Sequence, residues 1–243
     1  MLNAMLVECG AFRCHSCGTH QPKVRRLPST RLLLPIFAAA AAISGCVPVK
    51  DKPHPLVSVG EPSKADVWQD IASAADKQRL ANVSGAWAAG LADARKAGFA
   101  SALHDDRELL KSNAALARPA PTPGSYRCRL VKLGGKPAFE KFKPFFCYVE
   151  VDGNLLTIVK QTGSQRPAGR LWEDDNPNRL IFLGSLALGD QEAPLAYGDN
   201  PKRDMAGILE RTGPFRWRLV IPWPQDGSKL QAYELTPVAD QPE

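Results

Sequence analysis

Residues Phe215-Arg216-Trp217-Arg218-Leu219-Val220-Ile221 carry the pattern that decides the fold. From Phe215 to Ile221 every second side chain is large and apolar, and two arginines stand between the first of them. Successive side chains of a strand point to opposite faces, so this alternation predicts a strand with one buried face. Gly213-Pro214 precedes it and is typical of a tight turn, which predicts a hairpin with the strand before.

Seven other segments have the same strand character, and no helical pattern lies between them. With the stretch above, the predicted strands cover residues 126–133, 145–152, 155–161, 169–173, 179–185, 205–212, 215–221 and 229–236. Asp152-Gly153-Asn154 predicts a second hairpin. Eight short strands in succession predict an antiparallel β-meander that curls into a small barrel or a strongly bent sheet.

Residues 63–117 change the period from two to nearly four, which predicts helices. Trp68 and Ile71 fit a first helix, and Ser73 with Asp76 would begin a second one. Apolar residues at spacings of three and four follow up to Gly98, a helix stop, and a last helix is expected over 101–116. The fold class is therefore α+β, with N-terminal α-helices packed on or beside an antiparallel β-meander or small barrel of about eight strands.

The N-terminal part has the order of an export signal. Arginines up to Arg31 precede about a dozen mostly apolar residues, which are too few to cross a bilayer. Ile43-Ser44-Gly45-Cys46 then resembles the lipobox of bacterial lipoproteins. This resemblance implies cleavage before Cys46 and lipidation of that cysteine. Val47 follows where an aspartate often retains lipoproteins in the inner membrane, so outer-membrane attachment facing the periplasm is expected.

The expected organisation has five parts. They are a leader and signal peptide (1–45), a lipidated cysteine with a Pro-rich tether (46–62), a helical region (63–117), a Pro-rich linker (118–125) and the β domain (126–243). About 30 residues precede the apolar run, more than a signal peptide needs, so residues 1–23 are interpreted as lying upstream of the true start. Cys9, Cys14 and Cys17 in that stretch only superficially resemble metal ligands.

Charge gives little reason to expect nucleic-acid binding. The chain has a formal net charge of +6, but residues 1–45 hold five Lys/Arg and one acidic residue. Without them 26 basic and 24 acidic side chains remain, a net charge of +2. Nucleic-acid binding usually needs a clustered basic face, so no nucleic-acid partner is expected.

Cys128 and Cys147 are the two cysteines that remain after Cys46. Alternation places Cys128 on one face with Tyr126, and Cys147 on one face with Val149. If the two strands are antiparallel neighbours, both thiols point into one core. In an oxidising compartment a structural disulfide is then expected, worth about 3 kcal/mol.

Several motifs also resemble a family of proteobacterial exported proteins, catalogued as domain of unknown function 4893. They include Ala75-Asp76 and Trp87, then the runs 123–129, 162–166, 182–184 and 216–224. The resemblance covers roughly residues 68–235. It implies no activity, substrate or catalytic residue, so it supports only the boundaries of the fold.

Catalytic and metal sites find little support in the sequence. His104 and Glu108 stand four residues apart in the expected last helix, but a solvated polar face explains them better than a metal site. Asp174-Asp175 has the surroundings of an ordinary turn, and Ser185 lacks the second glycine of a hydrolase elbow. No catalytic residue, metal ligand or cofactor is therefore assigned.

The most promising polar segment is Thr162 to Pro167, expected as a loop between two strands. Bidentate arginines are suited to carboxylates and phosphates. The candidate contact residues for a ligand or partner are Ser164, Gln165, Arg166, Arg170, Arg203 and Arg211, with Arg166 the foremost. In the alternative interpretation these arginines pair internally. The acidic partners would be Glu173, Asp174, Asp204 and Glu210.

The sequence therefore favours a cell-envelope lipoprotein that acts as a non-enzymatic binding or interaction module. Its expected partners are the membrane, through the lipid on Cys46, and an envelope protein or an anionic envelope ligand. One alternative is a lysozyme-type inhibitor that presents a polar β-loop. Another is an enzyme of unrecognised type.

Overall fold

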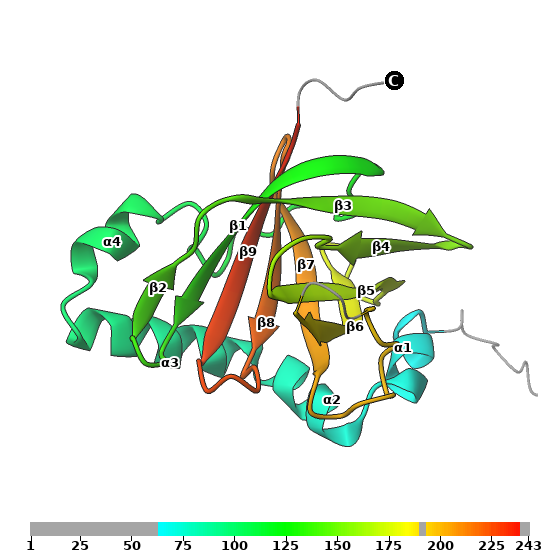
Figure 1. Ribbon diagram of the computed structural model, residues 1–243, viewed down its shortest axis with the longest axis horizontal. Helices are drawn as coiled ribbons and strands as arrows, with labels where there is room; N and C mark the ends of the chain where they lie inside the picture. The colour runs from blue at the N-terminus through cyan, green and yellow to red at the C-terminus, as the bar shows by residue number, and fades with distance from the viewer. Residues whose placement is uncertain (1–62, 190–192, 239–243) are drawn as a thin grey trace, which may run out of the picture. The chain divides into compact units, whose positions relative to one another are not determined.

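The computed structural model describes residues 63–189 and 193–238, and nine antiparallel strands make up the sheet of this part. The strands are β1 (Gly124–Leu133), β2 (Phe139–Lys141), β3 (Phe145–Asp152), β4 (Leu155–Val159), β5 (Gln165–Glu173), β6 (Leu180–Leu188), β7 (Asp204–Gly213), β8 (Arg216–Pro222) and β9 (Leu230–Pro237). Consecutive strands from β3 to β9 pair with each other, and β9 pairs back with β1. Eight strands thus form a closed barrel, which confirms the α+β class and the meander (Figure 1).

The ninth strand, β2, was not predicted. It pairs with residues 131–133 of β1, whereas β3 pairs with residues 124–128 of the same edge. Phe142 to Pro144 separate the two, so β2 and β3 divide one side of β1 between them. A strand of three residues is too short for an alternating pattern to become visible in the sequence.

The alternation in β8 corresponds to two different cores. Trp217, Leu219 and Ile221 are buried inside the barrel, while Val220 is buried on its outer face. Phe215 begins the sequence pattern but lies in the turn between β7 and β8, where it is 75% exposed. The predicted hairpin is therefore correct, and the strand begins one residue later than expected.

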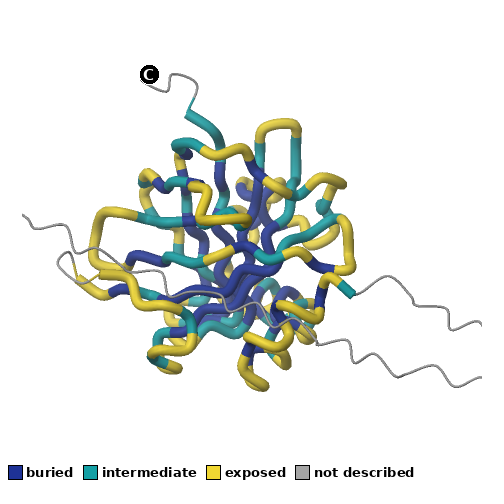
Figure 2. Tube along the Cα trace, turned by 90° about the vertical axis from the view of Figure 1, so that its right-hand side faces the viewer, coloured by how far each residue is buried: buried dark blue, intermediate teal, exposed yellow. Residues whose placement is uncertain are grey.

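Apolar side chains from all eight barrel strands fill the interior. The largest side chains that are fully buried there include Tyr126, Phe182 and Leu209. Tyr126 and Trp217 meet edge to face, with ring centroids 5.9 Å apart. The buried segments gather at the centre of the described part, and the exposed ones lie at loops and helix surfaces (Figure 2).

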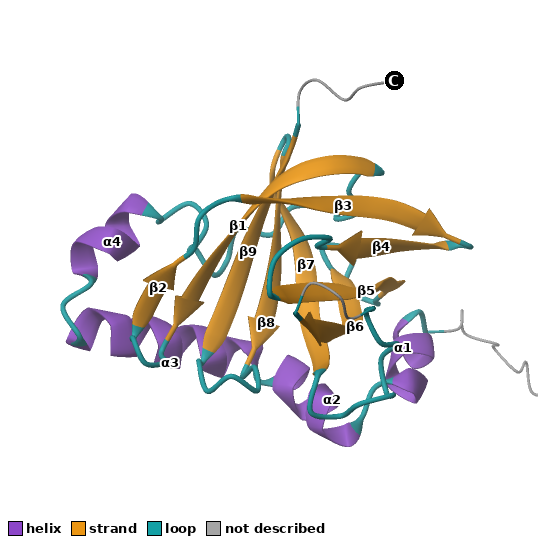
Figure 3. Ribbon diagram, viewed as in Figure 1, coloured by secondary structure: helices purple, strands orange, loops and turns teal. Residues whose placement is uncertain are grey.

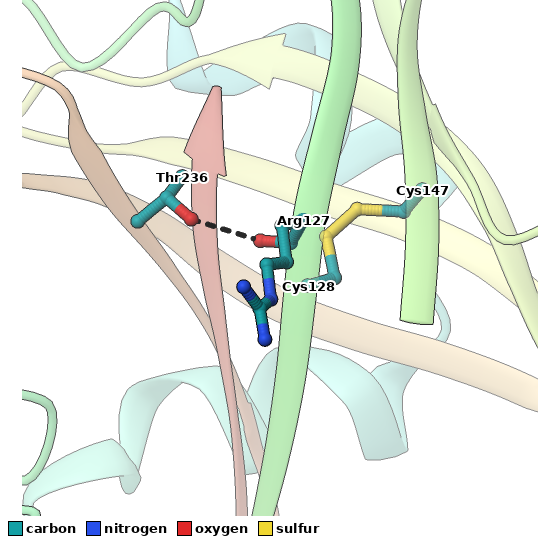
Figure 4. Close-up of a disulfide and its surroundings, with 4 residues drawn as sticks. All are labelled: Arg127, Cys128, Cys147 and Thr236. Carbon is teal, nitrogen blue, oxygen red and sulfur yellow. Dashed lines mark hydrogen bonds between the residues drawn. A yellow bond between two sulfur atoms is a disulfide. The ribbon is translucent and has the colours of Figure 1, made fainter. Parts of the chain in front are cut away.

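A disulfide joins Cys128 of β1 to Cys147 of β3 inside the barrel, as predicted. The two Cα atoms are 6.0 Å apart. On the other side of β1, the hydroxyl of Thr236 in β9 donates to the carbonyl oxygen of Arg127 (Figure 4). The disulfide therefore links β1 and β3 close to the place where β9 closes the barrel.

In the described part of the chain, four helices cover the outer surface of the barrel in two groups (Figure 3). The first group, α1 (Ala65–Ile71) and α2 (Ala74–Ala81), packs on β6 and β7. The second, α3 (Val83–Lys96) and α4 (Ala100–Asp105), packs on β1, β8 and β9. Ser73 caps α2 as predicted, since its Oγ accepts from the backbone N–H of Asp76 at 3.1 Å. No helix in residues 63–189 or 193–238 is both long and apolar enough to span a bilayer.

The predicted helix over 101–116 is wrong beyond Asp105, where α4 ends. Arg218 of β8 is completely buried beneath this segment and binds its backbone. One guanidinium nitrogen donates to the carbonyls of Leu109 at 2.8 Å and Lys111 at 2.7 Å. A buried guanidinium needs acceptors, and these carbonyls supply them in place of continuing a helix. Leu103, Leu109 and Leu110, which lie in the range of the predicted helix, are nevertheless buried.

The predictions for residues 1–62 lie outside the described residues. This applies to the leader, the lipobox, the lipidated Cys46 and the tether.

Candidate ligand site at the barrel mouth

One end of the barrel contains a hollow lined by described residues. At this end, which we call the barrel mouth, β1, β4, β6 and β8 end and β3, β5, β7 and β9 begin. The hollow, called the mouth pocket below, has a volume of about 600 Å³. Its lining residues are Leu130, Lys132, Glu140, Phe142, Lys143, Phe145, Lys160, Thr162, Gly163, Ser164, Gln165 and Tyr233.

The alternation of the strands explains why charged residues line this pocket. Leu130 and Ile158 point into the barrel core. Two residues further along the chain in each case, near the mouth, are Lys132 in β1 and Lys160, the first residue after β4. Side chains two apart share a face, so both lysines extend from inward-facing positions into the pocket. A lysine at an inward-facing position of a predicted strand can be recognised in the sequence and indicates a polar pocket. The sequence-based prediction did not use this pattern.

Lys132 is neutralised by a hydrogen-bonded network on one wall of the pocket. Its Nζ lies 2.7 Å from Oδ2 of Asp226, in the loop between β8 and β9. The same carboxylate oxygen accepts from Gln231 Nε2 at 2.7 Å, and Gln231 Oε1 accepts from the Tyr233 hydroxyl at 3.0 Å. Ser228 Oγ donates to the other carboxylate oxygen at 2.7 Å. Every polar group named on this wall thus has a partner.

The network sets the protonation of two of its members. Burial raises the pKa of Asp226, but the hydrogen bonds from Lys132 and Ser228 outweigh it and hold that pKa below its usual value. Asp226 is therefore a carboxylate at neutral pH. Burial raises the pKa of Tyr233 far above its usual value, and the negative charge of Asp226 raises it further. Tyr233 consequently stays a neutral hydroxyl that donates to Gln231.

Lys160 has a different environment. Its Nζ donates to the backbone carbonyl of Gln165 at 2.8 Å and lies 4.4 Å from the centre of the Phe145 ring. Burial lowers the pKa of Lys160, and the positive charge of Arg166 lowers it further. Among the described residues, no carboxylate pairs with Lys160. Within the described part of the chain, the pocket therefore contains a partly buried cation, Lys160, that is near a second cation and has no carboxylate paired to it.

The loop from Thr162 to Ser164 forms the exposed rim beside Lys160. Gly163 has a φ of +89°, a conformation that favours glycine. The backbone N–H of Gly189, just after β6, donates to the carbonyl of Ser164 at 2.9 Å and ties the rim to β6. The hydroxyl of Ser164 and the amide of Gln165 thus lie at the pocket edge, on backbone held from both sides.

The structure places Arg166 differently from the expected loop. β5 begins at Gln165, so Arg166 and Pro167 belong to a strand that the sequence predicted to start at Gly169. Pro167 directly precedes the residues of β5 that pair with β4, and its carbonyl accepts from the backbone N–H of Lys160 at 3.0 Å. Arg166 is only 8% exposed, and its Nε and Nη2 donate to the carbonyl of Gly189 at 3.2 and 2.8 Å. It therefore holds the end of β5 to the end of β6.

The other three candidate arginines lie apart from the mouth pocket. Arg170 is on the outer face of β5, where Nε and Nη2 bind Asp152 at 2.8 and 2.6 Å. Arg211 donates to the carbonyl of Ala117 at 2.9 Å, near the opposite end of the barrel. Arg203 lines a smaller hollow of about 60 Å³, which shares Gln165 and Tyr233 with the mouth pocket. Of the six candidates, only Ser164 and Gln165 line the mouth pocket.

The acidic residues proposed as internal partners mostly bind other groups. Glu173 pairs with Lys64, Asp174 with Arg179, and Glu210 with Arg218. The carboxylate of Asp204 accepts from the backbone N–H of Gly198. Arg170 does pair internally, as in the alternative interpretation, but with Asp152, which was not among the four carboxylates named there.

The other residues considered for catalysis or metal binding do not form a site, and most of them have a structural role. The turn at Asp174-Asp175 is confirmed, because Asp174 binds Arg179 and Asp175 accepts from the backbone N–H of Lys64. Since α4 ends at Asp105, His104 and Glu108 do not share a helical face. The described residues bring no group of three or more His, Cys, Asp or Glu together as a metal site. Ser185 is fully buried within β6.

These features define an α+β protein built on a closed eight-stranded antiparallel barrel, with a lysine-containing pocket at one end. The chain belongs to the family described as "Domain of unknown function (DUF4893)", whose model matches residues 68–235, well over half of the sequence. This confirms the family that its motifs resemble. No curated protein and no solved structure matches the chain.

Proposed function

We propose that this protein is a cell-envelope lipoprotein whose barrel binds an anionic component of the envelope at the mouth pocket and performs no catalysis on it. The observation that carries the proposal is Lys160, a partly buried cation in a pocket of about 600 Å³ with no carboxylate paired to it among the described residues. Pockets of this volume accommodate small-molecule ligands.

A binding role fits the groups that line the pocket. Lys132 and Tyr233 are engaged in their network, and Tyr233 is kept protonated by its burial. Lys143 and the rim residues Ser164 and Gln165 are exposed and offer a positive charge and hydrogen-bonding groups. Charges and hydrogen bonds from a fixed wall recognise an anion without needing to transfer a proton to or from it.

The envelope location rests on the sequence and on the disulfide. The lipobox at residues 43–46 supports export and lipidation of Cys46, and Val47 supports the outer membrane, facing the periplasm. The buried disulfide between Cys128 and Cys147 agrees with an oxidising compartment. Intact-mass spectrometry of the native protein tests this location. The expected mass is that of a chain beginning at a triacylated Cys46, and a chain that retains residues 1–45 would contradict it.

Hydrogen–deuterium exchange tests the binding site. The mature lipoprotein, held in nanodiscs, is compared with and without a low-molecular-mass extract of the envelope. Slower exchange is expected at the rim, residues 162–165, and at residues 142–145 across the pocket. Residues 209–213 at the end of β7, which lie at the opposite end of the barrel from the mouth, serve as the internal control. Protection confined to other segments, or no protection at all, would contradict ligand binding at the mouth pocket.

A further inference from the structure

We infer that the mouth pocket recognises a compact amphipathic anion, a carboxylate or phosphate on a small apolar body, and that Lys160 is its principal binding residue. This inference rests on the proposed binding role and adds the chemical class of the ligand. Three features of the pocket carry it: its floor, its apolar wall and its unbalanced cation.

The floor limits the length of the ligand. Directly beneath the pocket, the interior is occupied by the core side chains, including Ile158, Leu219 and Leu235. The void that remains there, bordered by Phe145 and Lys160, measures about 10 Å³. Such a volume holds one water molecule at most. A long acyl chain therefore has no channel to enter, and the ligand must be contained within the mouth.

The wall supplies an apolar surface of limited size. Leu130, Phe142 and Phe145 line the pocket, and both phenylalanines are only partly buried against the core. Lysine ammonium groups lie above both rings, with Lys132 5.2 Å from the centre of Phe142 and Lys160 4.4 Å from that of Phe145. A small ring or short aliphatic group that packs on these side chains would hold its anionic substituent next to the lysines.

The charges select an anion. Lys132, Lys143 and Lys160 line the pocket, against one carboxylate, Glu140, among its described lining residues. Asp226 already neutralises Lys132, whereas the partners of Lys160 among the described residues are a backbone carbonyl and an aromatic ring. A bound anion would give Lys160 a charge-assisted hydrogen bond and offset the repulsion from Arg166. A neutral ligand would offer neither.

The test is a ¹⁹F NMR titration of the mature lipoprotein in nanodiscs. The probes are the anions 4-fluorobenzoate and 4-fluorophenyl phosphate and the neutral 4-fluorobenzamide. Inorganic phosphate carries no fluorine, so its binding is measured by competition with the two aromatic anions. The two aromatic anions should bind about tenfold more tightly than the amide. The tighter of the two identifies the headgroup. Inorganic phosphate should compete only weakly, because it lacks the apolar body. Palmitate in the nanodisc membrane should not displace either aromatic anion.

Variants assign the interaction to Lys160. Lys160→Gln should weaken the binding of both aromatic anions about tenfold and leave that of the amide unchanged. Lys160→Arg keeps the positive charge and should retain most of the affinity. Lys77→Gln removes an exposed lysine on α2 and should change nothing. Circular dichroism verifies that each variant is folded. If Lys160→Gln does not fold, Lys160→Arg is the test variant, and it should still bind the two aromatic anions more tightly than the amide.

Three outcomes would overturn the inference: equal affinity for the amide and the anions, full affinity in Lys160→Gln, or displacement by palmitate. They are distinguishable from failure of the proposed function. If the envelope extract protects residues 162–165 from exchange but the fluorinated anions do not bind, the pocket is a binding site for another class of ligand. If neither experiment shows binding at the mouth, the proposed function fails with the inference.

Discussion

Lys132 and Lys160 occupy equivalent positions near the barrel mouth, each two residues after a side chain that points into the barrel core. Their environments nevertheless differ. Lys132 has the carboxylate of Asp226 within 2.7 Å, and Lys160 has a carbonyl and an aromatic ring. The difference arises because the loop between β8 and β9 places Asp226 beside β1, while β4 is followed by the uncharged segment Gln161 to Gln165. At the level of single residues, this asymmetry gives Lys132 a structural role, and Lys160 is the lysine that we propose binds a ligand.

Asp226 gives a prediction about pH. Its pKa is lowered in the folded protein, so the ionised carboxylate adds stability above its unfolded pKa, and this stability is lost as the pH falls through the folded pKa. Asp226→Asn should therefore lower the free energy of unfolding by about 1–2 kcal/mol at neutral pH. The difference in stability from the unsubstituted protein should begin to narrow below about pH 4 and close once the pH is below the lowered folded pKa.

Urea unfolding at a series of pH values measures this gap. Asp105→Asn, at an exposed position on α4, is the control and should show no gap at any pH. A gap for Asp226→Asn that is constant from neutral to acid pH would show that the carboxylate charge is not what stabilises the mouth.

Arg218 gives a prediction about the core. Its guanidinium is fully buried, binds Glu210 and backbone carbonyls of 109–112, and lies 4.9 Å from the Trp87 ring centre. Arg218→Met would leave these acceptors buried without a donor and should cost about 3 kcal/mol. The same substitution at Arg170, whose pair with Asp152 is half exposed, should cost less than about 1 kcal/mol. Thermal unfolding compares the two, and equal losses would contradict this role of Arg218.

At the scale of elements, the strands were predictable because each has one face in the barrel interior. That condition produces the alternation seen in 215–221 and in most of the other strands. Each element that was predicted wrongly has its own cause. β2 is too short to show a period, and the segment after Asp105 gives its carbonyls to a side chain more than a hundred residues away. β5 was predicted to begin at Gly169 instead of Gln165, because the polar segment 162–167, with Gly163 and Pro167, is typical of a loop.

The disulfide gives a prediction about β1 and β3. Cys128 and Cys147 are separated by 19 residues in sequence, so their bond should add about 3 kcal/mol by restricting the unfolded chain. A reducing agent should therefore lower the urea midpoint of the unsubstituted protein. The double variant Cys128→Ser/Cys147→Ser should unfold at a lower midpoint that the reducing agent does not change. Identical midpoints with and without reducing agent in the unsubstituted protein would contradict the prediction.

At the scale of the whole described part, three apolar cores share the barrel wall. One fills the interior, and two lie between the outer face and the helix pairs. Because the interior is full, the pocket is restricted to the mouth. The sequence predicted the polar rim at Ser164 and Gln165, but the pocket also draws on β1, β3 and β9. Closure of the barrel brings these elements together, and a local sequence pattern carries no information about it.

The proposed role is tested most directly by the reactivity of each lysine toward an amine-acylating reagent, measured by mass spectrometry. The protein is labelled in native membranes and again after purification and extensive dialysis. If an envelope anion occupies the mouth pocket, Lys160 should be labelled several-fold more slowly in native membranes, relative to the exposed Lys77 and Lys96 on α2 and α3. The same relative labelling of Lys160 in both preparations would contradict a ligand at the barrel mouth.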